Sequence, residues 1–273
     1  MAGPRIARGP GRSFFRRLTV DILDNRGMSF KDLFSQGAES YARYRPRYPD
    51  QLFTWLADNV SPGEVAADLG TGNGQVASAL APHFAAVVGL DPSAEQLANA
   101  LPHPRVTYRC ASAEATGLDD GSVDLLVAGQ AFHWFDQGRF FDEVRRVVRP
   151  GGMLAIWCYG LTTITPEVDG VIAHLYADVV GPFWEPERRL VETAYREVAV
   201  PFAELKAPAF QMRARWGLEQ LQGYLATWSA FKRCLKVNGT GPLDLVFAQL
   251  AAAWGDAPER GVTWPLGVRA FRI

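Results

Sequence analysis

The segment Asp68-Leu69-Gly70-Thr71-Gly72-Asn73-Gly74 decides the fold, because it joins an apolar run to a helical one through a bend rich in glycine. Val65-Ala66-Ala67 before the bend is typical of a buried strand, while Val76 and Leu80 after it are spaced as on one face of a helix. Glycine has no Cβ and tolerates positive φ, so the chain can turn sharply here. The segment therefore predicts a turn at which a ligand can approach bare backbone.

Short apolar runs and helical patterns alternate on the C-terminal side of this bend. Further strands are predicted at 85–90, 106–108, 123–128 and 153–158, with helices from Ser93 and over 139–148 between them. Five apolar runs with helices between them predict parallel strands covered on both faces, and 210–216 and 262–271 alternate like antiparallel strands. We expect a doubly wound, Rossmann-like α/β fold, with a mostly parallel seven-stranded sheet, helices on both faces and an antiparallel C-terminal edge.

Residues 28–273 are expected to form one domain with an insertion around 160–235. Helices are predicted over 29–44, from Pro49 onwards, and over 166–180 and 218–231. The aromatic and charged stretch 183–189 is interpreted either as a lid that selects the ligand or as an amphipathic surface helix. Large aromatic residues near the C-terminus are expected in the core, namely Trp228, Phe231, Trp254 and Trp264.

Residues 1–27 differ from the rest of the chain, because five arginines precede the first acidic residue, Asp21. This opening is compatible with an organelle transit peptide, with a disordered tail, or with an extension produced by a misplaced start codon. We favour the last interpretation, because Met28 opens a segment that resembles a natural beginning.

The bulk composition excludes several classes of protein. With 273 residues, 48% of them hydrophobic, the chain can bury a sizeable core, and its net charge of −1 gives no field that would attract nucleic acid or an anionic membrane. No apolar run approaches the roughly 20 residues that span a bilayer. The cysteines at 110, 158 and 234 show no metal spacing and are expected to be reduced and mostly buried. We expect a cytoplasmic protein with a small, nearly neutral partner and no metal, and a homodimer is left open.

The spacing of the glycines distinguishes between nucleotide cofactors. Glycines at 70, 72 and 74 give G-x-G-x-G, whereas a dinucleotide fingerprint, G-x-G-x-x-G, needs glycine at position 75, which is Gln75. Asp91 ends the next apolar run, 21 residues after Gly70, where a carboxylate can accept hydrogen bonds from both hydroxyls of a ribose. An acid at this position is also common as a helix N-cap, so the prediction depends on its combination with the glycine bend.

From about residue 28 to residue 160, the order and spacing of these motifs resemble those of class I S-adenosylmethionine-dependent methyltransferases. The resemblance is carried by the bend 68–74, Asp91, Ser112-Ala113-Glu114, 124–134 and Arg149-Pro150-Gly151-Gly152. The opening residues Phe34, Tyr41, Arg45-Pro46 and Tyr48-Pro49, with His133-Trp134-Phe135, are similar to the subgroup of trans-aconitate methyltransferase-like proteins. The superfamily resemblance is specific, whereas the resemblance to that subgroup does not extend to its substrate.

The resemblance implies a position for each part of the cofactor S-adenosylmethionine. The bend, with Asp68, Gly70, Thr71 and Gly72, would hold its methionine part, and Asp91 its ribose. Ala113 and Glu114 would border the adenine, and Gln130 would lie where the methyl group points. Tyr41 and Arg45 would close over the site, with Arg45 available for the cofactor carboxylate. Helix packing by Tyr41 and solvation of Arg45 is an equally good interpretation of these two residues.

The implied activity is methyl transfer by in-line displacement to a small-molecule acceptor, with a carboxylate or a hydroxyl as candidates. Positioning supplies most of such a rate enhancement, so neither a nucleophile nor a metal is required. A hydroxyl acceptor must lose a proton, and His133 is the candidate general base, although His133 can equally shape the pocket through a hydrogen bond. Two alternatives remain: a cofactor-binding regulator without turnover and, less well supported by the glycine spacing, a nicotinamide-dependent oxidoreductase.

Overall fold

The computed structural model describes residues 44–61 and 63–273. The predicted extension 1–27, residues 29–43 of the first predicted helix and the predicted cofactor residue Tyr41 lie outside this part of the chain. Within it, strands are joined in the order β3-β2-β1-β4-β5-β8-β6, and β7 also pairs with β8. The strands are β1 Val65–Leu69, β2 Ala86–Asp91, β3 Val106–Cys110, β4 Val123–Gly129, β5 Val148–Tyr159, β6 Ala203–Leu205, β7 Phe210–Trp216 and β8 Arg260–Arg272.

The predicted doubly wound, mostly parallel sheet with an antiparallel C-terminal edge is confirmed. Strands β1 to β5 pair in parallel, and β8 runs antiparallel to β5. The sheet of the described residues has eight strands and not the predicted seven. The additional strand is β6, a three-residue strand that was not predicted. It pairs with the C-terminal end of β8, which is 13 residues long and also pairs with β5 near that end and with β7 near its start.

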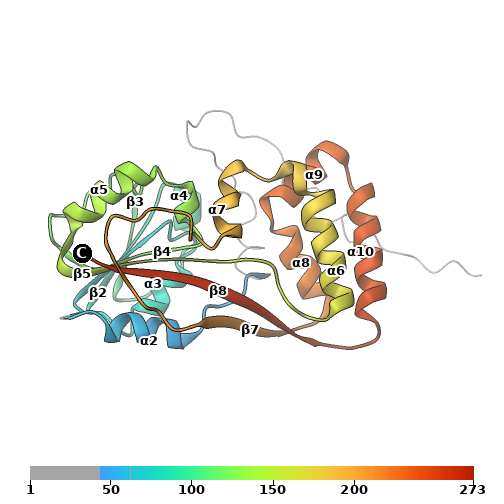
Figure 1. Ribbon diagram of the computed structural model, residues 1–273, viewed down its shortest axis with the longest axis horizontal. Helices are drawn as coiled ribbons and strands as arrows, with labels where there is room; N and C mark the ends of the chain where they lie inside the picture. The colour runs from blue at the N-terminus through green and yellow to red at the C-terminus, as the bar shows by residue number, and fades with distance from the viewer. Residues whose placement is uncertain (1–43, 62) are drawn as a thin grey trace, which may run out of the picture.

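The helices form two groups at opposite ends of the long strand β8 (Figure 1). Helices α2 Asp50–Asp58, α3 Gln75–Leu80, α4 Ala94–Ala98 and α5 Gln137–Val147 surround the parallel strands, and α6 Pro166–His174, α8 Leu218–Ala226, α9 Ser229–Asn238 and α10 Gly241–Trp254 form the second group. Short helical segments connect the groups: η2 Phe132–Trp134, η3 Leu175–Val179, η4 Gly181–Phe183, η5 Pro186–Arg188 and α7 Arg189–Glu192.

Strand β4 shows how the sheet is buried on both faces. Leu125 and Val127 belong to one hydrophobic core with α2, α3 and the second helix group, whereas Leu126 and Ala128 belong to another core with α5 and α7. Successive side chains of a strand point to opposite faces, so one apolar strand serves two cores. The aromatic residues predicted to be core, Trp228, Phe231, Trp254 and Trp264, are all buried.

Three predicted features of the second helix group differ from the structure. The predicted helix 166–180 ends its regular α-helix at His174 and continues as the π-helical segment η3. The predicted helix 218–231 is two helices, because Trp228 is extended, with φ −65° and ψ 137°. Helix α10 was not predicted, because its sequence is apolar around most of its circumference and lacks the polar face that marks a surface helix.

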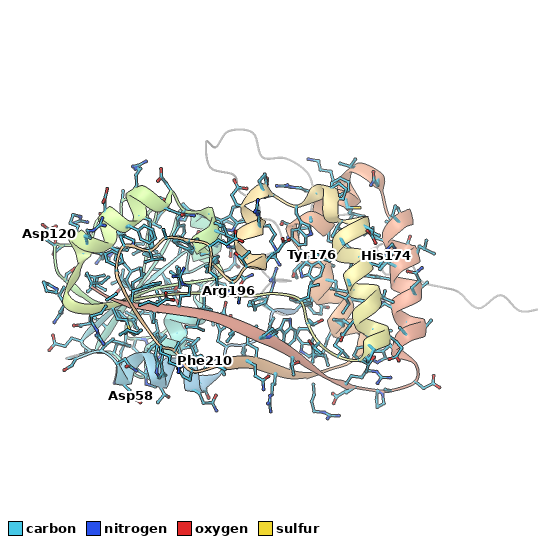
Figure 2. The ribbon with its side chains drawn as sticks, in the orientation of Figure 1. Asp58, Asp120, His174, Tyr176, Arg196 and Phe210 are labelled. Atoms are coloured by element: carbon cyan, nitrogen blue, oxygen red, sulfur yellow. The ribbon has the colours of Figure 1, made fainter. Side chains whose placement is uncertain are left out.

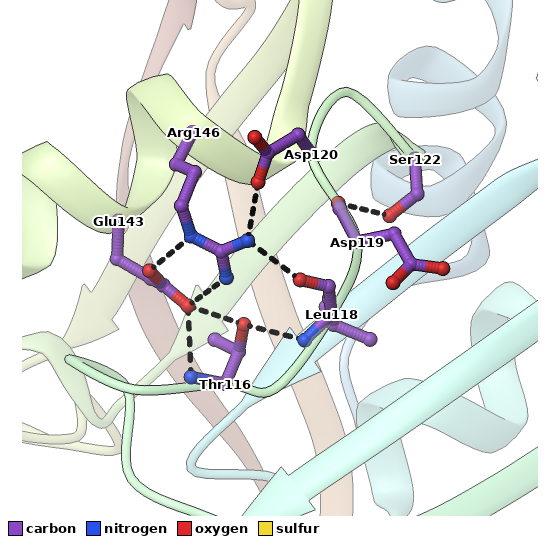
Figure 3. A network of polar contacts seen from close by, with 7 residues as sticks. All are labelled: Thr116, Leu118, Asp119, Asp120, Ser122, Glu143 and Arg146. Carbon is purple, nitrogen blue, oxygen red and sulfur yellow. Dashed lines mark hydrogen bonds and ion pairs between the residues drawn. The ribbon is translucent and has the colours of Figure 1, made fainter.

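A polar network with Thr116 and Glu143 buried at its centre fixes the loop between β3 and β4 onto helix α5 (Figure 3). Glu143 accepts hydrogen bonds from the backbone and hydroxyl of Thr116, and Arg146 bonds both oxygens of the same carboxylate. Arg146 also bonds the Leu118 carbonyl and Asp120. The Arg146 guanidinium, followed by the Thr116 donors, outweighs burial and lowers the pKa of Glu143 to about 2.

Two further predictions concern the state of the cysteines and the length of the apolar helices. Cys110, Cys158 and Cys234 are free thiols, and all but Cys110 are buried, as expected. No helix within 44–61 and 63–273 combines the length and the apolar character that crossing a membrane requires.

Candidate functional site

The glycine bend follows β1 and leads directly into α3, as predicted. Gly70, Gly72 and Gly74 all have positive φ, of 68°, 55° and 79°. The bend is tied to the end of β2, because the backbone N–H groups of Gly70 and Thr71 both donate to the Leu90 carbonyl, at 2.8 and 3.0 Å. The loops that follow β1 and β2 therefore lie side by side at the carboxyl edge of the sheet, where ligands bind in open α/β sheets.

Each glycine of the bend is required for a different reason. A Cβ on Gly70 would lie 2.5 Å from the Cβ of Ala131, and a Cβ on Gly74 would overlap the Tyr108 ring. In front of Gly72, by contrast, the nearest atom to a Cβ would be Oε1 of Gln96, at 3.9 Å. Gly70 and Gly74 thus make room for neighbouring side chains, whereas Gly72 leaves room for a ligand.

Asp91 joins the two loops. Its Oδ2 accepts a hydrogen bond from the Gly72 N–H at 2.9 Å, and its Oδ1 accepts one from the Ser93 N–H at 2.9 Å. A carboxylate can accept about four hydrogen bonds, so holding the bend is compatible with binding ribose hydroxyls as well. The predicted contact with ribose stays a prediction, and the structure adds a second task, which is to fix the backbone of Gly72.

The side chains of Asp68 and Thr71 form hydrogen bonds within the bend. Asp68 is 1% exposed, and its Oδ2 accepts hydrogen bonds from the Thr71 hydroxyl at 2.6 Å and from the Ala77 N–H at 3.1 Å. Desolvation raises the pKa of Asp68 to about 7 despite these two donors. Both residues lie in the predicted bend, and the contacts that the structure shows for them are with the bend itself.

The predicted adenine residues lie on the loop after β3. Ala113 is buried against the core that contains Leu90. Glu114 Oε1 accepts a hydrogen bond from the Asp136 N–H at 2.9 Å, which ties this loop to the start of α5. Their contact with adenine stays a prediction.

Gln130 lies directly after β4 and has a positive φ of 57°, a strained conformation for a residue other than glycine. Its side chain bonds the backbone of Tyr159 in both directions: Oε1 accepts from the N–H at 2.8 Å, and Nε2 donates to the carbonyl at 3.4 Å. The side-chain amide of Gln130 therefore continues the hydrogen bonding between β4 and β5 beyond the end of β4. This fixed geometry places Gln130 in the wall of a pocket.

The pocket lies beside the glycine bend, because Gln130 and His133 in its wall flank Ala131, which packs on Gly70. Its lining combines residues that follow β4 with residues of the connecting segments and the start of α9: Arg45, Gln130, His133, Trp134, Trp184, Glu185, Arg188, Trp228 and Ser229. Three predicted site residues, Arg45, Gln130 and His133, thus come together. The segment 183–189, predicted as a lid or a surface helix, supplies three further lining residues.

Two guanidinium groups face this pocket. Arg45 Nη1 donates to the Tyr159 hydroxyl at 2.7 Å, and its Cζ lies 5.4 Å from the centre of the Tyr224 ring. The Cζ of Arg188 lies 4.7 Å from the Trp184 ring and 5.9 Å from the ring of Tyr176, which Figure 2 labels beside α6.

The lining also contains one acidic residue, Glu185, which forms an ion pair with Arg233. Two arginines and one glutamate give the lining a formal charge of +1, whereas the whole chain has a net charge of −1.

His133 is 5% exposed, and its Nδ1 lies 2.9 Å from the hydroxyl of Tyr195. Burial, followed by the charge of Arg188, lowers the pKa of His133 to about 3. The predicted role as a general base is untested, and this pKa describes a weak base that is neutral at pH 7. Tyr195 was not predicted, because it belongs to no motif and is 62 residues from His133. Arg188 was expected near the site only as part of the segment 183–189.

Comparisons with known proteins agree with this geometry. A family model described as a methyltransferase domain matches residues 67–156, which contain the bend, Asp91 and His133. A candidate methyltransferase from Dictyostelium discoideum is 31% identical over 245 residues, 87% of this chain and 93% of that protein. An uncharacterized methyltransferase from Schizosaccharomyces pombe is 29% identical over 204 residues, 73% of this chain and 80% of that protein.

A solved structure extends the similarity across both helix groups. The structure of a candidate type II methyltransferase from Anaeromyxobacter dehalogenans shares 46% identity, with a TM-score of 0.78, and covers 84% of this chain and 98% of that one. The chain therefore belongs to the class I methyltransferases, the family whose methyl donor is S-adenosylmethionine.

Proposed function

We propose that the protein transfers the methyl group of S-adenosylmethionine to a small organic acid held in the pocket beside the glycine bend. The observation that carries this proposal is the pair of guanidinium groups, Arg45 and Arg188, in a wall that also contains three tryptophans. Guanidinium groups bind carboxylates through paired, charge-assisted hydrogen bonds, and indole faces suit a flat apolar body. A small acid with an apolar part matches both features.

An acceptor in the pocket interacts with the charges of the lining more strongly than with the net charge of the chain. The net charge of the chain favoured a nearly neutral partner, but the lining has two guanidinium groups, Arg45 and Arg188, and one carboxylate, Glu185, which pairs with Arg233. An amine acceptor would bring another positive charge beside them. A carboxylate is therefore the better of the acceptor classes that the sequence left open.

The bend fits the cofactor, because the space in front of Gly72 can accept a ligand. The corresponding spaces at Gly70 and Gly74 are filled by neighbouring side chains. Asp91 and the Gly72 backbone would hold S-adenosylmethionine, which supplies an electrophilic methyl group. Arg45 and Arg188 would orient the acid, so that one carboxylate oxygen faces that methyl group. An oxygen lone pair forms the new C–O bond, the C–S electron pair stays on sulfur, and no proton is transferred. The protein contributes positioning, which accounts for roughly 7 to 11 kcal/mol in model reactions.

The test is release of S-adenosylhomocysteine from the full chain with S-adenosylmethionine and panels of small carboxylic acids, phenols and amines. The proposal predicts turnover with members of the acid panel and an ester as the product. Turnover confined to phenols or amines would contradict it. Cofactor binding without turnover on any panel would favour the alternative of a regulator that does not catalyse.

A pair of adjacent arginines gives a matched test of the acid site. Replacing Arg188 with Gln removes a pocket cation, whereas Arg189→Gln changes its exposed neighbour outside the lining. Loss of a charge-assisted hydrogen bond of about 1.5 to 3 kcal/mol should raise KM for the acid about 10- to 100-fold in Arg188→Gln only. Equal KM values in the two variants would remove Arg188 from the acceptor site.

A further inference from the structure

The contact between His133 and Tyr195 gives the imidazole a defined orientation. The hydroxyl of Tyr195 lies 2.9 Å from Nδ1, and the two rings are stacked with centres 6.2 Å apart and planes 29° apart. Tyr195 is fully buried, and His133 lines the pocket. Within the described residues Nδ1 is therefore the nitrogen that the protein occupies, and Nε2 is left for a ligand.

The backbone around Tyr195 is built to hold that hydroxyl in place. Ala194 and Tyr195 both have positive φ, of 52° and 60°, and such residues cost roughly 1 to 3 kcal/mol each unless the surrounding structure enforces them. Two contacts hold this backbone in place. Ala194 packs so closely on Gly267 of β8 that a Cβ on Gly267 would overlap it. Arg269 donates hydrogen bonds to the carbonyls of Tyr195 and Val198, at 2.7 and 2.9 Å. Strain held at two consecutive residues indicates that the position of this side chain matters.

The Tyr195 hydroxyl has two possible acceptors for its hydrogen. One is Nδ1 of His133, at 2.9 Å. The other is the sulfur of Cys158, whose own S–H donates to the Val191 carbonyl. Sulfur is the weaker acceptor, so donation to Nδ1 is favoured over donation to sulfur.

The charges around the ring favour its neutral form. Arg188 approaches it from η5, and Arg45 with the Glu185–Arg233 pair completes the charged part of the pocket, while Cys158 and Tyr195 lie beneath as neutral groups. A protonated imidazole would add a further cation to this buried site. Burial and Arg188 lower the pKa of His133 to about 3, in agreement with this geometry.

We propose that Tyr195 is a positioning residue. It does not take part in the reaction but holds His133 as the Nε2–H tautomer, so that Nε2 of His133 donates a hydrogen bond to the acid that is methylated. This differs from the general base considered from the sequence. Its second part rests on the proposed function, because a donor at Nε2 would bind a carboxylate oxygen that needs no deprotonation.

The tautomer can be measured without any ligand. Nitrogen–proton correlation spectra of the uniformly ¹⁵N-labelled full chain, recorded from about pH 5 to about pH 8, distinguish Nε2–H from Nδ1–H imidazoles, and His133→Gln identifies the signals of His133 by their loss. We expect a pure Nε2–H pattern that does not titrate over this range. Tyr195→Phe should convert it to a mixture, whereas the control Tyr224→Phe, which removes another buried phenol, should leave it unchanged. An Nδ1–H pattern, or titration near the ordinary pKa of histidine, would overturn the proposal.

Turnover with an acid from the panel separates donor from base. A glutamine amide can replace an Nε2–H donor but cannot accept a proton, so His133→Gln should stay within about 10-fold of the parent kcat/KM while His133→Ala loses more. If both variants lose kcat/KM equally and the parent kcat/KM falls below about pH 6 to 7, His133 acts as a base. If both variants keep the parent kcat/KM, His133 does not bind the acceptor. The spectra stand independently of turnover: an Nε2–H pattern without acid methylation refutes the proposed function alone, and acid methylation with an Nδ1–H pattern refutes this inference alone.

Discussion

Asp91 connects the architecture of the bend to its proposed ligand. The carboxylate holds the Gly72 and Ser93 backbone amides, so the atom that would bind ribose is positioned by the loop that would bind the rest of the cofactor. A residue with both tasks is sensitive to substitution, because removing it loses a ligand contact and also releases the bend.

Replacing Asp91 with Ala should weaken binding of S-adenosylhomocysteine by about 1.5 to 3 kcal/mol, or about 10- to 160-fold in Kd, through loss of a charge-assisted contact. The control is Asp119→Ala, an exposed acid on the loop between β3 and β4. Calorimetric titration of the parent and both variants measures the effect, and an unchanged Kd in Asp91→Ala would reject this assignment.

His133 gives a residue-scale prediction of pH-dependent stability. Its pKa is about 3 in the folded protein and near 6.5 in the unfolded chain, so only the unfolded chain takes up this proton between those values. The contribution to stability is therefore complete above about pH 6.5 and is lost as the pH falls. The unfolding free energy of the parent minus that of His133→Gln should fall by about 1.4 kcal/mol per pH unit from about pH 6 to pH 4. A difference independent of pH would show that His133 is accessible to protons.

At the scale of elements, the network of Glu143 and Arg146 joins the loop after β3 to helix α5. Ala113 and Glu114 lie in the same loop, and Glu114 is itself bonded to the start of α5. Helix α5 therefore holds the loop that contains the predicted adenine residues at two points, Glu114 and Thr116.

The pKa of Glu143 is lowered, so its stabilising effect is present above its ordinary pKa of 4.5 and is lost as the pH falls toward 2. Glu143→Gln should lower the unfolding free energy at pH 7 by about 1 to 3 kcal/mol and flatten its decline below about pH 4.5. Asp142→Asn, which breaks the exposed pair with Arg145 on the same helix, should cost less than about 1 kcal/mol. Denaturant unfolding across pH measures both, and equal effects would contradict a special role for Glu143.

The elements also show which sequence signals were sufficient. Strands β1 to β5 were predictable, because parallel strands buried on both faces are short apolar runs, and the alternation of β7 and β8 predicted their antiparallel pairing. The break at Trp228 was not, because a buried aromatic cluster holds that residue extended where its neighbours favour helix. Tertiary packing overrode local preference there.

On the scale of the whole molecule, the pocket is formed where the residues that follow β4 meet the segment 184–188 and the start of α9. Motifs close to the bend, such as Asp91 and Gln130, were predictable because their distance from the glycines along the chain is typical of the fold. Arg188 was expected only as part of the segment 183–189 and Tyr195 was not predicted, because Arg188 reaches the pocket and Tyr195 reaches His133 only when the segment after β5 folds back. The proposed cofactor half of the site is therefore encoded close to the glycine bend, whereas the proposed acceptor half depends on contacts between distant segments.

Calorimetric titration of the full chain with S-adenosylhomocysteine measures whether the space in front of Gly72 receives the cofactor. We predict one binding site in the parent chain and none detectable in Gly72→Val, whose side chain would fill that space. Gly239→Val, at a positive-φ glycine after α9 with no neighbour within 4 Å of a Cβ, controls for backbone strain and should bind as the parent does. Absence of binding to the parent chain, or equal affinity of Gly72→Val and the parent, would contradict the account.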